Sequence, residues 1–370
     1  MSDLGIYVHI PFCKKKCNYC DFISFSCDEK IISDYFETLK KEIQNYDIEK
    51  RKVSSIYFGG GTPSYPDSSF IVDILNTIKE KFEVNEDCEI TIEVNPGTVT
   101  KDKLADYKNA GFNRLSIGLQ STHDRLLKLI GRIHKFNDFL ETYNISKNVG
   151  FNNINVDLML ALPTQTEDEL IQSINKVIDL NPNHISLYSL ILEENTKLYE
   201  QVQNKELNLC DEELERKMYW KTKKILEENG YNHYEISNFS KKGFESKHNL
   251  ACWNQEEYLG FGLAAHSYLN GKRFLNSESI DEYIKNNKIQ INETQDDLAR
   301  RKEFMLLGLR KIEGVSISEF ERRFRINPLF YFRFEISKLT DEELIEVDLD
   351  NIKLTDKGLD LANKAFEEFI

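Results

Sequence analysis

A chain of 370 residues is long enough for one large domain and a smaller one. Hydrophobic residues make up 40% and charged residues 30%, as in ordinary soluble globular proteins. The net charge of -14 makes nucleic acids and anionic membranes poor partners, because an acidic surface repels phosphates. No apolar run approaches the roughly 20 residues of a transmembrane helix, and the N-terminus lacks the basic region of a signal peptide. We therefore expect a cytoplasmic protein that is not integral to a membrane.

Short β-rich runs alternate with amphipathic helical patterns over the first half of the chain. Strands are predicted at residues 6–10, 55–59, 89–94, 114–119, 155–159 and 184–189, and helices at residues 31–43, 69–82, 101–110 and 167–180. Several of these strands are almost continuously apolar, as in a parallel sheet that helices cover on its outer face. Six β/α repeats without a dinucleotide glycine fingerprint predict an α/β fold, a partial (β/α)6 TIM-like barrel. Its functional residues should lie at the carboxyl ends of the strands.

The alternation stops near residue 195. A helix is predicted over residues 211–229, followed by a glycine- and aromatic-rich stretch (231–274) and a polar connector (276–295). Helices near 296–311, 316–324 and 329–339 precede a strand–turn–strand at 345–354 and a final helix from residue 356. We predict a β/α core (1–200), an extension of it (201–290) and a small, mostly helical, winged-helix-like C-terminal domain (291–370). In so acidic a chain, this last domain should pack against the barrel rather than bind DNA.

Three cysteines, Cys13, Cys17 and Cys20, lie on a short loop directly after the first predicted strand. Their spacing matches neither the bacterial ferredoxin run nor a pair of zinc-binding C-x-x-C knuckles. A 4Fe–4S cluster held by three cysteines leaves one iron open, and S-adenosylmethionine (SAM) offers an amine and a carboxylate to chelate it. Electron transfer from the cluster can then split the C–S bond of SAM. The alternatives are a structural zinc site and a cluster completed by Cys27.

Further motifs follow the strands in order. They are YVHIPFC (7–13), GGGTP (59–63), Glu93, Gln120, GRIH (131–134) and DLMLALP (157–163). With the cysteine triplet, these motifs resemble the radical SAM superfamily, and within it the oxygen-independent coproporphyrinogen oxidase group. The resemblance runs from Tyr7 to the C-terminus and implies a radical SAM barrel that binds a 4Fe–4S cluster and SAM.

Two branches of that group differ in function. The decarboxylating oxidase has an N-terminal extension and a further cysteine where this chain has Phe22. The segments EVNPGT (93–98), YLGFGLAAH (258–266) and HNLACW (248–253) instead resemble the haem chaperone (HemW) branch, with Cys252 replacing a tyrosine. The resemblance implies a protein that binds haem and passes it to haem-requiring acceptors, some of them at the membrane. The alternative is an enzyme that decarboxylates coproporphyrinogen III, an activity we do not expect here. The oligomeric state is left open.

The resemblance also implies a SAM pocket. Its predicted members are Tyr7, Tyr19, Gly60, Gly61, Thr62, Glu93, Gln120, Arg132 and Asp157. The bare backbone of the glycines allows a ligand to approach closely. The guanidinium of Arg132 is suited to the carboxylate of SAM, and the carboxylates of Glu93 and Asp157 to its amine or ribose hydroxyls. The two tyrosines either flank the cluster or pack in the core.

Three residues are candidates to bind haem iron. His248 and Cys252 are four residues apart, which places both on one face of a helix, and Trp253 offers an apolar surface for the porphyrin. His266, after two glycines, is the third candidate. The alternative for the first motif is that its asparagine and tryptophan only fix a loop to the barrel. His9 lies on an apolar strand and is expected to be a core residue.

Overall fold

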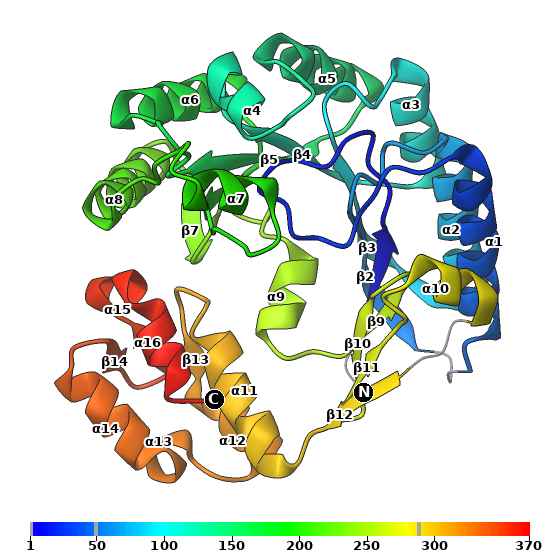
Figure 1. The fold of residues 1–370 in the computed structure, drawn as a ribbon. Helices are drawn as coiled ribbons and strands as arrows, with labels where there is room; N and C mark the ends of the chain where they lie inside the picture. Colours follow the sequence, from blue (N-terminus) through cyan, green and yellow to red (C-terminus); the bar gives the residue numbers. More distant parts are fainter. Residues whose placement is uncertain (1–2, 48–50, 287–289) are drawn as a thin grey trace.

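The computed structural model describes residues 3–47, 51–286 and 290–370. Its central feature is a curved sheet in which the first six strands run parallel in sequence order (Figure 1). These strands are β1 (Leu4–Ile10), β2 (Lys52–Gly60), β3 (Glu83–Val94), β4 (Arg114–Gln120), β5 (Asn153–Leu160) and β6 (His184–Ser189). All six had been predicted from the sequence, and the partial (β/α)6 barrel is confirmed.

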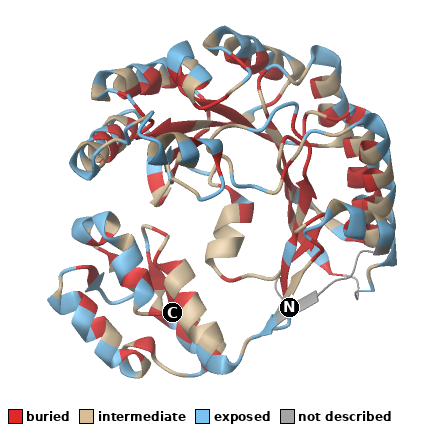
Figure 2. Cartoon of the chain, viewed as in Figure 1, coloured by how far each residue is buried: buried red, intermediate tan, exposed pale blue. Residues whose placement is uncertain are grey.

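Helices cover the outer face of this sheet as an arc (Figure 1). They are α1 (Glu29–Asn45), α2 (Ser68–Lys81), α3 (Lys101–Ala110), α5 (Phe136–Val149), α6 (Glu167–Leu180) and α8 (Glu212–Glu228). The short helices α4 (Asp124–Leu129) and α7 (Lys197–Gln203) follow β4 and β6. Side chains at the N-caps fix where helices begin: Asp28, Thr100 and Thr166 each accept a hydrogen bond from a backbone N–H of the first turn. The apolar strand residues are buried beneath these helices (Figure 2).

The sheet extends beyond the six predicted strands at both edges. Next to β1 lies the parallel strand β9 (Tyr258–Phe261), followed by antiparallel β10 (His266–Leu269), β11 (Lys272–Leu275) and β12 (Gln290–Thr294). Next to β6 lie antiparallel β8 (Asn238–Ser240) and β7 (Asn232–Glu235). Strands from beyond residue 200 thus share one sheet with the first half, and the boundary proposed there is no break in the sheet.

The predicted polar connector over residues 276–295 was wrong in part, because it contains α10 (Ile280–Asn286) and β12. The helix is held by Tyr283, which is buried and donates a hydrogen bond from its hydroxyl to Glu42 of α1 at 2.6 Å. Strand β12 pairs with β11 through backbone groups, which polar residues supply as well as apolar ones. Neither feature gives the alternating apolar pattern on which the prediction depended.

The C-terminal domain has a hydrophobic core of its own. It contains α11 (Asp297–Gly308), β13 (Val315–Ser316), α12 (Ile317–Phe324), α13 (Pro328–Tyr331), α14 (Arg333–Asp341), β14 (Ile345–Val347), β15 (Asn351–Leu354), α15 (Asp356–Asp360) and α16 (Ala362–Glu367). The predicted hairpin is present, and its turn is closed by the carboxylate of Asp348, which accepts hydrogen bonds from two backbone N–H groups. The winged-helix-like arrangement is therefore confirmed.

Helix α9 (Lys247–Trp253) lies between the barrel and the C-terminal domain (Figure 1). The guanidinium of Arg310 stacks 4.5 Å from the ring centroid of Trp253. The Nζ of Lys311 donates to Asn254 Oδ1 at 2.8 Å, and Arg323 donates to the Asn254 carbonyl at 2.9 Å. The end of α9 is thus one docking point of the domain; α8 is another, since Arg216 and Trp220 both donate to Asp360. None of the helices in the described part of the chain has the length and apolar character needed to cross a bilayer.

Candidate functional site

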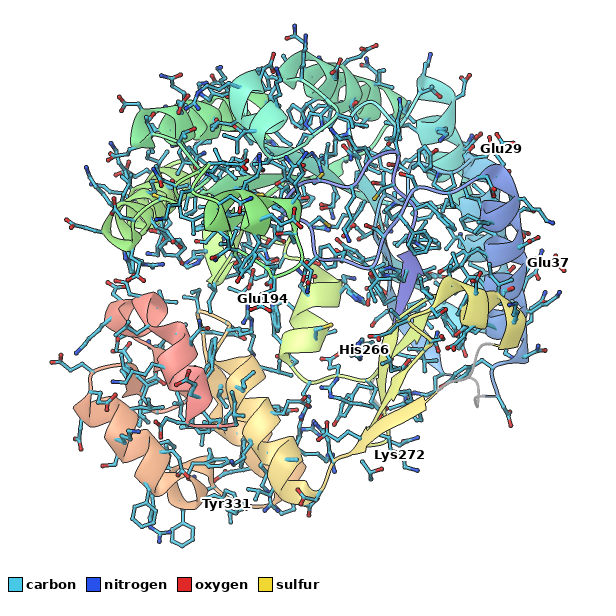
Figure 3. All side chains as sticks on the ribbon, viewed as in Figure 1. Glu29, Glu37, Glu194, His266, Lys272 and Tyr331 are labelled. Carbon is cyan, nitrogen blue, oxygen red and sulfur yellow. The ribbon has the colours of Figure 1, made fainter. Side chains whose placement is uncertain are left out.

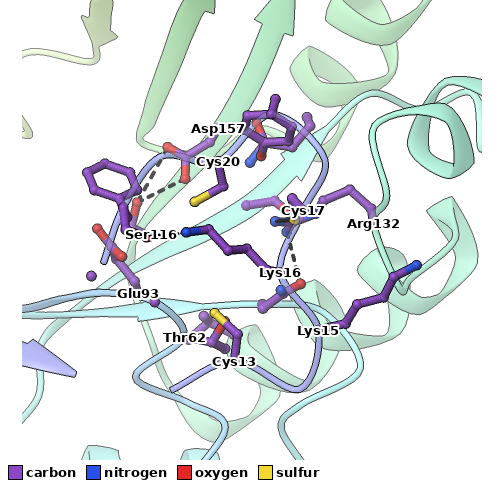
Figure 4. Close-up of a pocket in the computed structure, with 18 of the residues that line it drawn as sticks. Cys13, Lys15, Lys16, Cys17, Cys20, Thr62, Glu93, Ser116, Arg132 and Asp157 are labelled. Atoms are coloured by element: carbon purple, nitrogen blue, oxygen red, sulfur yellow. Dashed lines mark hydrogen bonds between the residues drawn. The ribbon is translucent and has the colours of Figure 1, made fainter. Parts of the chain in front are cut away.

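The three cysteines of the triplet line one cavity at the carboxyl end of the barrel strands (Figure 4). The cavity has a volume of about 360 Å³. The Sγ of Cys13 lies 3.4 Å from Thr62 Oγ1, and the Sγ of Cys17 lies 3.6 Å from a guanidinium nitrogen of Arg132. Cys27 is not among the described residues that line this cavity. The loop after β1 therefore presents exactly the predicted three thiols to a space able to hold a ligand.

Asn18 fixes this cysteine loop to the rest of the barrel. Its backbone N–H donates to the Ile130 carbonyl at 2.9 Å, and its side-chain amide donates to the Leu129 carbonyl at 2.8 Å. Its own carbonyl accepts from the Leu198 N–H at 2.7 Å. Gly131 makes the close approach possible: a Cβ there would lie 2.7 to 2.9 Å from Asn18 atoms. The backbone between Cys17 and Cys20 is consequently positioned by contacts with α4 and α7.

Polar side chains from successive strands form the wall of the cavity opposite the cysteines. Strand residues two apart point to the same face, so the inward positions of β3, β4 and β5 bring Glu93, Ser116 and Asp157 together. Of the predicted SAM-pocket residues, those that line the cavity are Tyr19, Gly60, Gly61, Thr62, Glu93, Gln120, Arg132 and Asp157. Tyr7 lies deeper, with its hydroxyl 3.1 Å from His9 Nδ1, and is not among the described lining residues.

Sequence reasoning missed several lining residues, including Asn95, Ser116, Gly118, Tyr57 and Tyr188. Two of them had a usable signal: residues 116 and 118 share the inward face of β4 with Gln120, at the same two-residue spacing. The absence of a side chain at Gly118 also makes room for Arg132, since a Cβ there would lie 2.9 Å from its guanidinium. The pattern of inward positions could therefore have extended the predicted site by these two residues of β4.

The buried guanidinium of Arg132 joins several parts of the site. It donates to the Gly118 carbonyl at 2.5 Å and to Asn95 Oδ1 at 2.9 Å, and it approaches Cys17. Its Nε is buried and has no hydrogen-bond partner within the described residues. An unpaired donor in a buried charged group is costly, and an anionic ligand in the cavity would lower that cost. This supports the prediction that Arg132 faces a carboxylate.

Two half-buried carboxyl groups face the same cavity, and the pKa of each is raised. Burial first, and then the charge of Asp157, raise the pKa of Glu93 to about 7. Burial likewise raises the pKa of Asp157, although Asn155 donates to it at 2.7 Å. The Tyr57 hydroxyl donates to Glu93 Oε1 at 2.9 Å. In an empty cavity it is unfavourable for both carboxyl groups to be ionised at once. A cationic group such as an amine would stabilise their ionised forms and donate hydrogen bonds to them.

The donor set fits an iron–sulfur cluster better than a single ion. Within the described residues, no three His, Cys, Asp or Glu side chains gather closely enough to hold one metal ion. In a 4Fe–4S cluster each thiolate binds a different iron, so the three sulfurs surround the cluster rather than meet at one point. Gly61 keeps this space free, because a Cβ there would lie 3.1 Å from the Cys13 sulfur. The arrangement thus fits the cluster and disfavours the alternative of a structural zinc ion.

The predicted haem ligand His248 lies at the opposite end of the barrel, on α9. Its ring is buried, with Nδ1 3.1 Å from Ser55 Oγ and its plane stacked on Tyr57 at a centroid distance of 5.2 Å. Its backbone N–H donates to Glu89 Oε1 at 3.3 Å. We call Ser55, Glu89 and His248, which close the N-terminal end of the barrel, the barrel floor; Tyr57 lies between this floor and the cavity. A porphyrin has no access to a ring packed there, so the geometry favours the alternative that this motif fixes α9 to the barrel.

The other two haem candidates lie outside the cavity as well. Cys252 does share a helix face with His248, but burial raises the pKa of its thiol to about 11, so a thiolate is disfavoured at neutral pH. His266 begins β10 and has an exposed side chain (Figure 3). Of the three candidates, His266 alone has the exposure that a direct iron ligand needs. All three stay predictions.

The chain was compared with known proteins. The Radical SAM superfamily model matches residues 7–177, and the HemN C-terminal domain model matches residues 295–361. The "Heme chaperone HemW" of Lactococcus lactis is 37% identical over 98% of this chain and 96% of its own length. The protein of the same name from Bacillus subtilis is 36% identical over 98% of each chain. The chain belongs to the HemW family.

The fold of this HemW-family protein is also that of a solved structure. Coproporphyrinogen III oxidase (HemN) from Escherichia coli, described as a radical SAM enzyme, superposes with a TM-score of 0.85. The superposition covers 99% of this chain and 90% of the oxidase, at 23% sequence identity. Radical SAM membership implies a 4Fe–4S cluster and SAM, and the residues of the cavity fit that pair.

The contact between Gly131 and the cysteine loop leads to a testable expectation. Gly131→Ala places a methyl group against Asn18 and should displace the loop, with at least a twofold loss of iron retained after anaerobic reconstitution. Gly97→Ala is the matched control: both glycines have φ of +82°, but a Cβ at Gly97 meets nothing within 4 Å. Equal iron content in the two variants would show that the contact with Asn18 does not position the cysteines.

The raised pKa of Glu93 predicts how its removal changes stability with pH. The usual pKa is 4.5, so between pH 4.5 and 7 the folded state keeps a proton that the unfolded chain releases. Glu93 therefore lowers stability as pH rises through this window. In the cluster-free protein, the free energy of unfolding of Glu93→Gln relative to that of wild type should rise by on the order of 2 kcal/mol from pH 5 to pH 8. Urea unfolding at each pH measures this difference, and Glu206→Gln, at an exposed residue, is the control. A difference between Glu93→Gln and wild type that stays the same from pH 5 to pH 8 would contradict the expectation.

Proposed function

We propose that this protein is a haem chaperone, which binds haem and delivers it to haem-requiring acceptor proteins. The observation that carries the proposal is similarity to proteins named heme chaperone over essentially the whole chain, joined to an intact cofactor cavity. Cys13, Cys17 and Cys20 would hold a 4Fe–4S cluster, and the remaining iron would bind SAM. When bound, this pair supplies electron-transfer chemistry at the carboxyl end of the barrel.

The protein's own groups have distinct roles in that cavity. Gly60 and Gly61 offer backbone without side chains beside the cysteine loop. The guanidinium of Arg132 is already held in place by Gly118 and Asn95, so it would meet the carboxylate of SAM with little loss of conformational freedom on binding. Glu93 and Asp157 accept hydrogen bonds from its amine or hydroxyls. The cavity is thereby organised before the cofactor arrives.

Oxidation of coproporphyrinogen III is the second candidate, because the oxidase has the same fold. Phe22 speaks against it. The oxidase branch is expected to have a cysteine at this position, and here an aromatic ring lines the cavity and is largely exposed. A phenyl ring cannot replace a thiol in redox or proton-transfer chemistry. We therefore propose binding and transfer of a finished tetrapyrrole rather than conversion of its precursor.

The cluster assignment is tested by cysteine variants. Replacing Cys13, Cys17 or Cys20 by alanine should abolish the cluster, measured as iron content near four per chain in wild type and by its absorption and EPR signals. Cys27→Ala is the matched control and should keep wild-type iron, because Cys27 does not line the cavity. Cluster loss in the Cys27 variant would mean that a fourth thiolate occupies the site that SAM needs.

The function itself is tested by giving the anaerobically reconstituted protein haem and, separately, coproporphyrinogen III. We expect a stoichiometric haem complex that transfers haem to an apo acceptor, and no conversion of the porphyrinogen in the presence of SAM and a working reductant. Multiple turnovers to the decarboxylated product would establish the oxidase instead. Absence of any haem complex would refute the chaperone proposal.

A further inference from the structure

The open end of the cofactor cavity is bordered by exposed apolar side chains. Phe22, Tyr188 and Ile191 are exposed by 61%, 40% and 69%. The first two line the cavity, and the third follows in the segment after β6. Large exposed apolar side chains grouped at the edge of a cavity are typical of a binding surface. They cost free energy in water, and an apolar ligand that covers them recovers it.

The segment that carries Ile191 is held next to the cysteine loop. The Leu190 N–H donates to the Leu160 carbonyl at 3.1 Å, and the Leu190 side chain packs with Tyr19 against a small apolar cluster. Further along, the Leu198 N–H donates to the carbonyl of Asn18. The two segments are therefore joined by the Leu198–Asn18 hydrogen bond and pack on the same cluster through Leu190 and Tyr19, which places residues 190–198 beside the cysteine loop.

The same opening carries a positive charge. Lys14, Lys15 and Lys16 are exposed, and the last two line the cavity (Figure 4). Lys16 also donates to the Phe22 carbonyl at 2.9 Å, which keeps its ammonium group beside the apolar ring. From Cys13 to Phe22 the loop has three lysines and one aspartate, in a chain whose net charge is -14. A local excess of positive charge on an acidic protein attracts anions to that place.

We define the mouth rim as Phe22, Tyr188, Ile191 and the three lysines 14–16. We propose that the mouth rim is where haem binds, with the macrocycle on the apolar side chains and its two propionates on the lysines. The inference rests on the proposed chaperone function and names the site that this function uses. A flat apolar ring with carboxylates at one edge is complementary to an apolar border with ammonium groups at one side.

The mouth rim implies recognition of the ring and its propionates rather than of iron. No histidine is among the described residues that line the cavity, and His248 is packed in the barrel floor. Metal-free protoporphyrin IX has the same ring and the same propionates. It should therefore bind to this site with an affinity within a few fold of that of haem, which an essential axial ligand would not allow.

Binding of haem and of protoporphyrin IX to the cluster-loaded protein, followed by absorption and fluorescence quenching, tests the proposal. Ile191→Glu should weaken both by about tenfold or more, the value of one buried aliphatic side chain. Leu209→Glu, at another exposed aliphatic side chain, is the matched control and should bind as wild type. Lys14→Glu should weaken both ligands several fold and lower the salt dependence, whereas the exposed Lys242→Glu should not. Iron content of each variant shows that the cluster is intact.

The outcomes separate this inference from the proposed function. If wild type binds haem but Ile191→Glu and Lys14→Glu bind it equally well, the mouth rim is wrong and the chaperone proposal stands. Loss of haem binding in His266→Ala or His248→Ala, with no binding of protoporphyrin IX to wild type, also overturns the mouth rim in favour of iron ligation. Failure of wild type to bind haem removes the function on which the inference rests.

Discussion

The buried guanidinium of Arg132 is the interaction on which the open end of the barrel depends. It follows α4, yet it holds the carbonyl of Gly118 on β4, the amide oxygen of Asn95 after β3 and the sulfur of Cys17. Removing a charged group from water costs free energy unless its donors are satisfied, and these contacts occupy both terminal nitrogens of the guanidinium. Moving any one of these segments would leave the guanidinium with a further unpaired donor. Arg132 thus ties the cysteine loop to the ends of β3 and β4, in addition to the contacts that Asn18 makes.

A second constraint is the polar interior below the cavity. Asn155 donates to Asp157 at 2.7 Å and lies 2.6 Å from His184 Nδ1, and His184 Nε2 lies 2.7 Å from the Tyr234 hydroxyl. That hydroxyl accepts from the backbone N–H of Ser246, the N-cap of α9. A continuous hydrogen-bonded chain therefore runs from the cofactor cavity to the helix that closes the barrel floor. Buried polar groups of this kind fix one arrangement of a core, because each depends on its partner.

The fold and part of the candidate site could be predicted where the residue type and the apolar pattern of the sequence indicated the same feature. The six parallel strands could be predicted from their apolar runs, and the three cysteines from their spacing. Glu93, Gln120 and Asp157 were implied by the family resemblance, and Asp157 lies inside β5 rather than at its end. The inward residues Ser116 and Gly118 were missed because nothing in their type marks them; they become lining residues through the two-residue period of β4. Asn18 could not be predicted at all, since its partners lie more than a hundred residues away.

The motif HNLACW shows that a correct local prediction does not by itself decide a role. The residues do form a helix, and His248 and Cys252 do share one of its faces, as their spacing indicates. Tertiary contacts decide which way that face points. His248 contacts Ser55, Tyr57 and Glu89 of the barrel. Trp253 stacks with Arg310 of the C-terminal domain. The motif therefore joins barrel, floor and C-terminal domain.

This arrangement gives the two ends of the barrel different tasks. The floor end is closed by α9 and consists of packed and paired groups, so it stabilises the fold. The other end combines three thiols, a prepared cavity and an exposed apolar and basic border. The residues at this open end are where we propose that this chain differs from the oxidase branch. A phenyl ring at Phe22, where the resemblance implies a thiol in that branch, would remove a reactive group and add apolar surface, as the proposed binding without conversion requires.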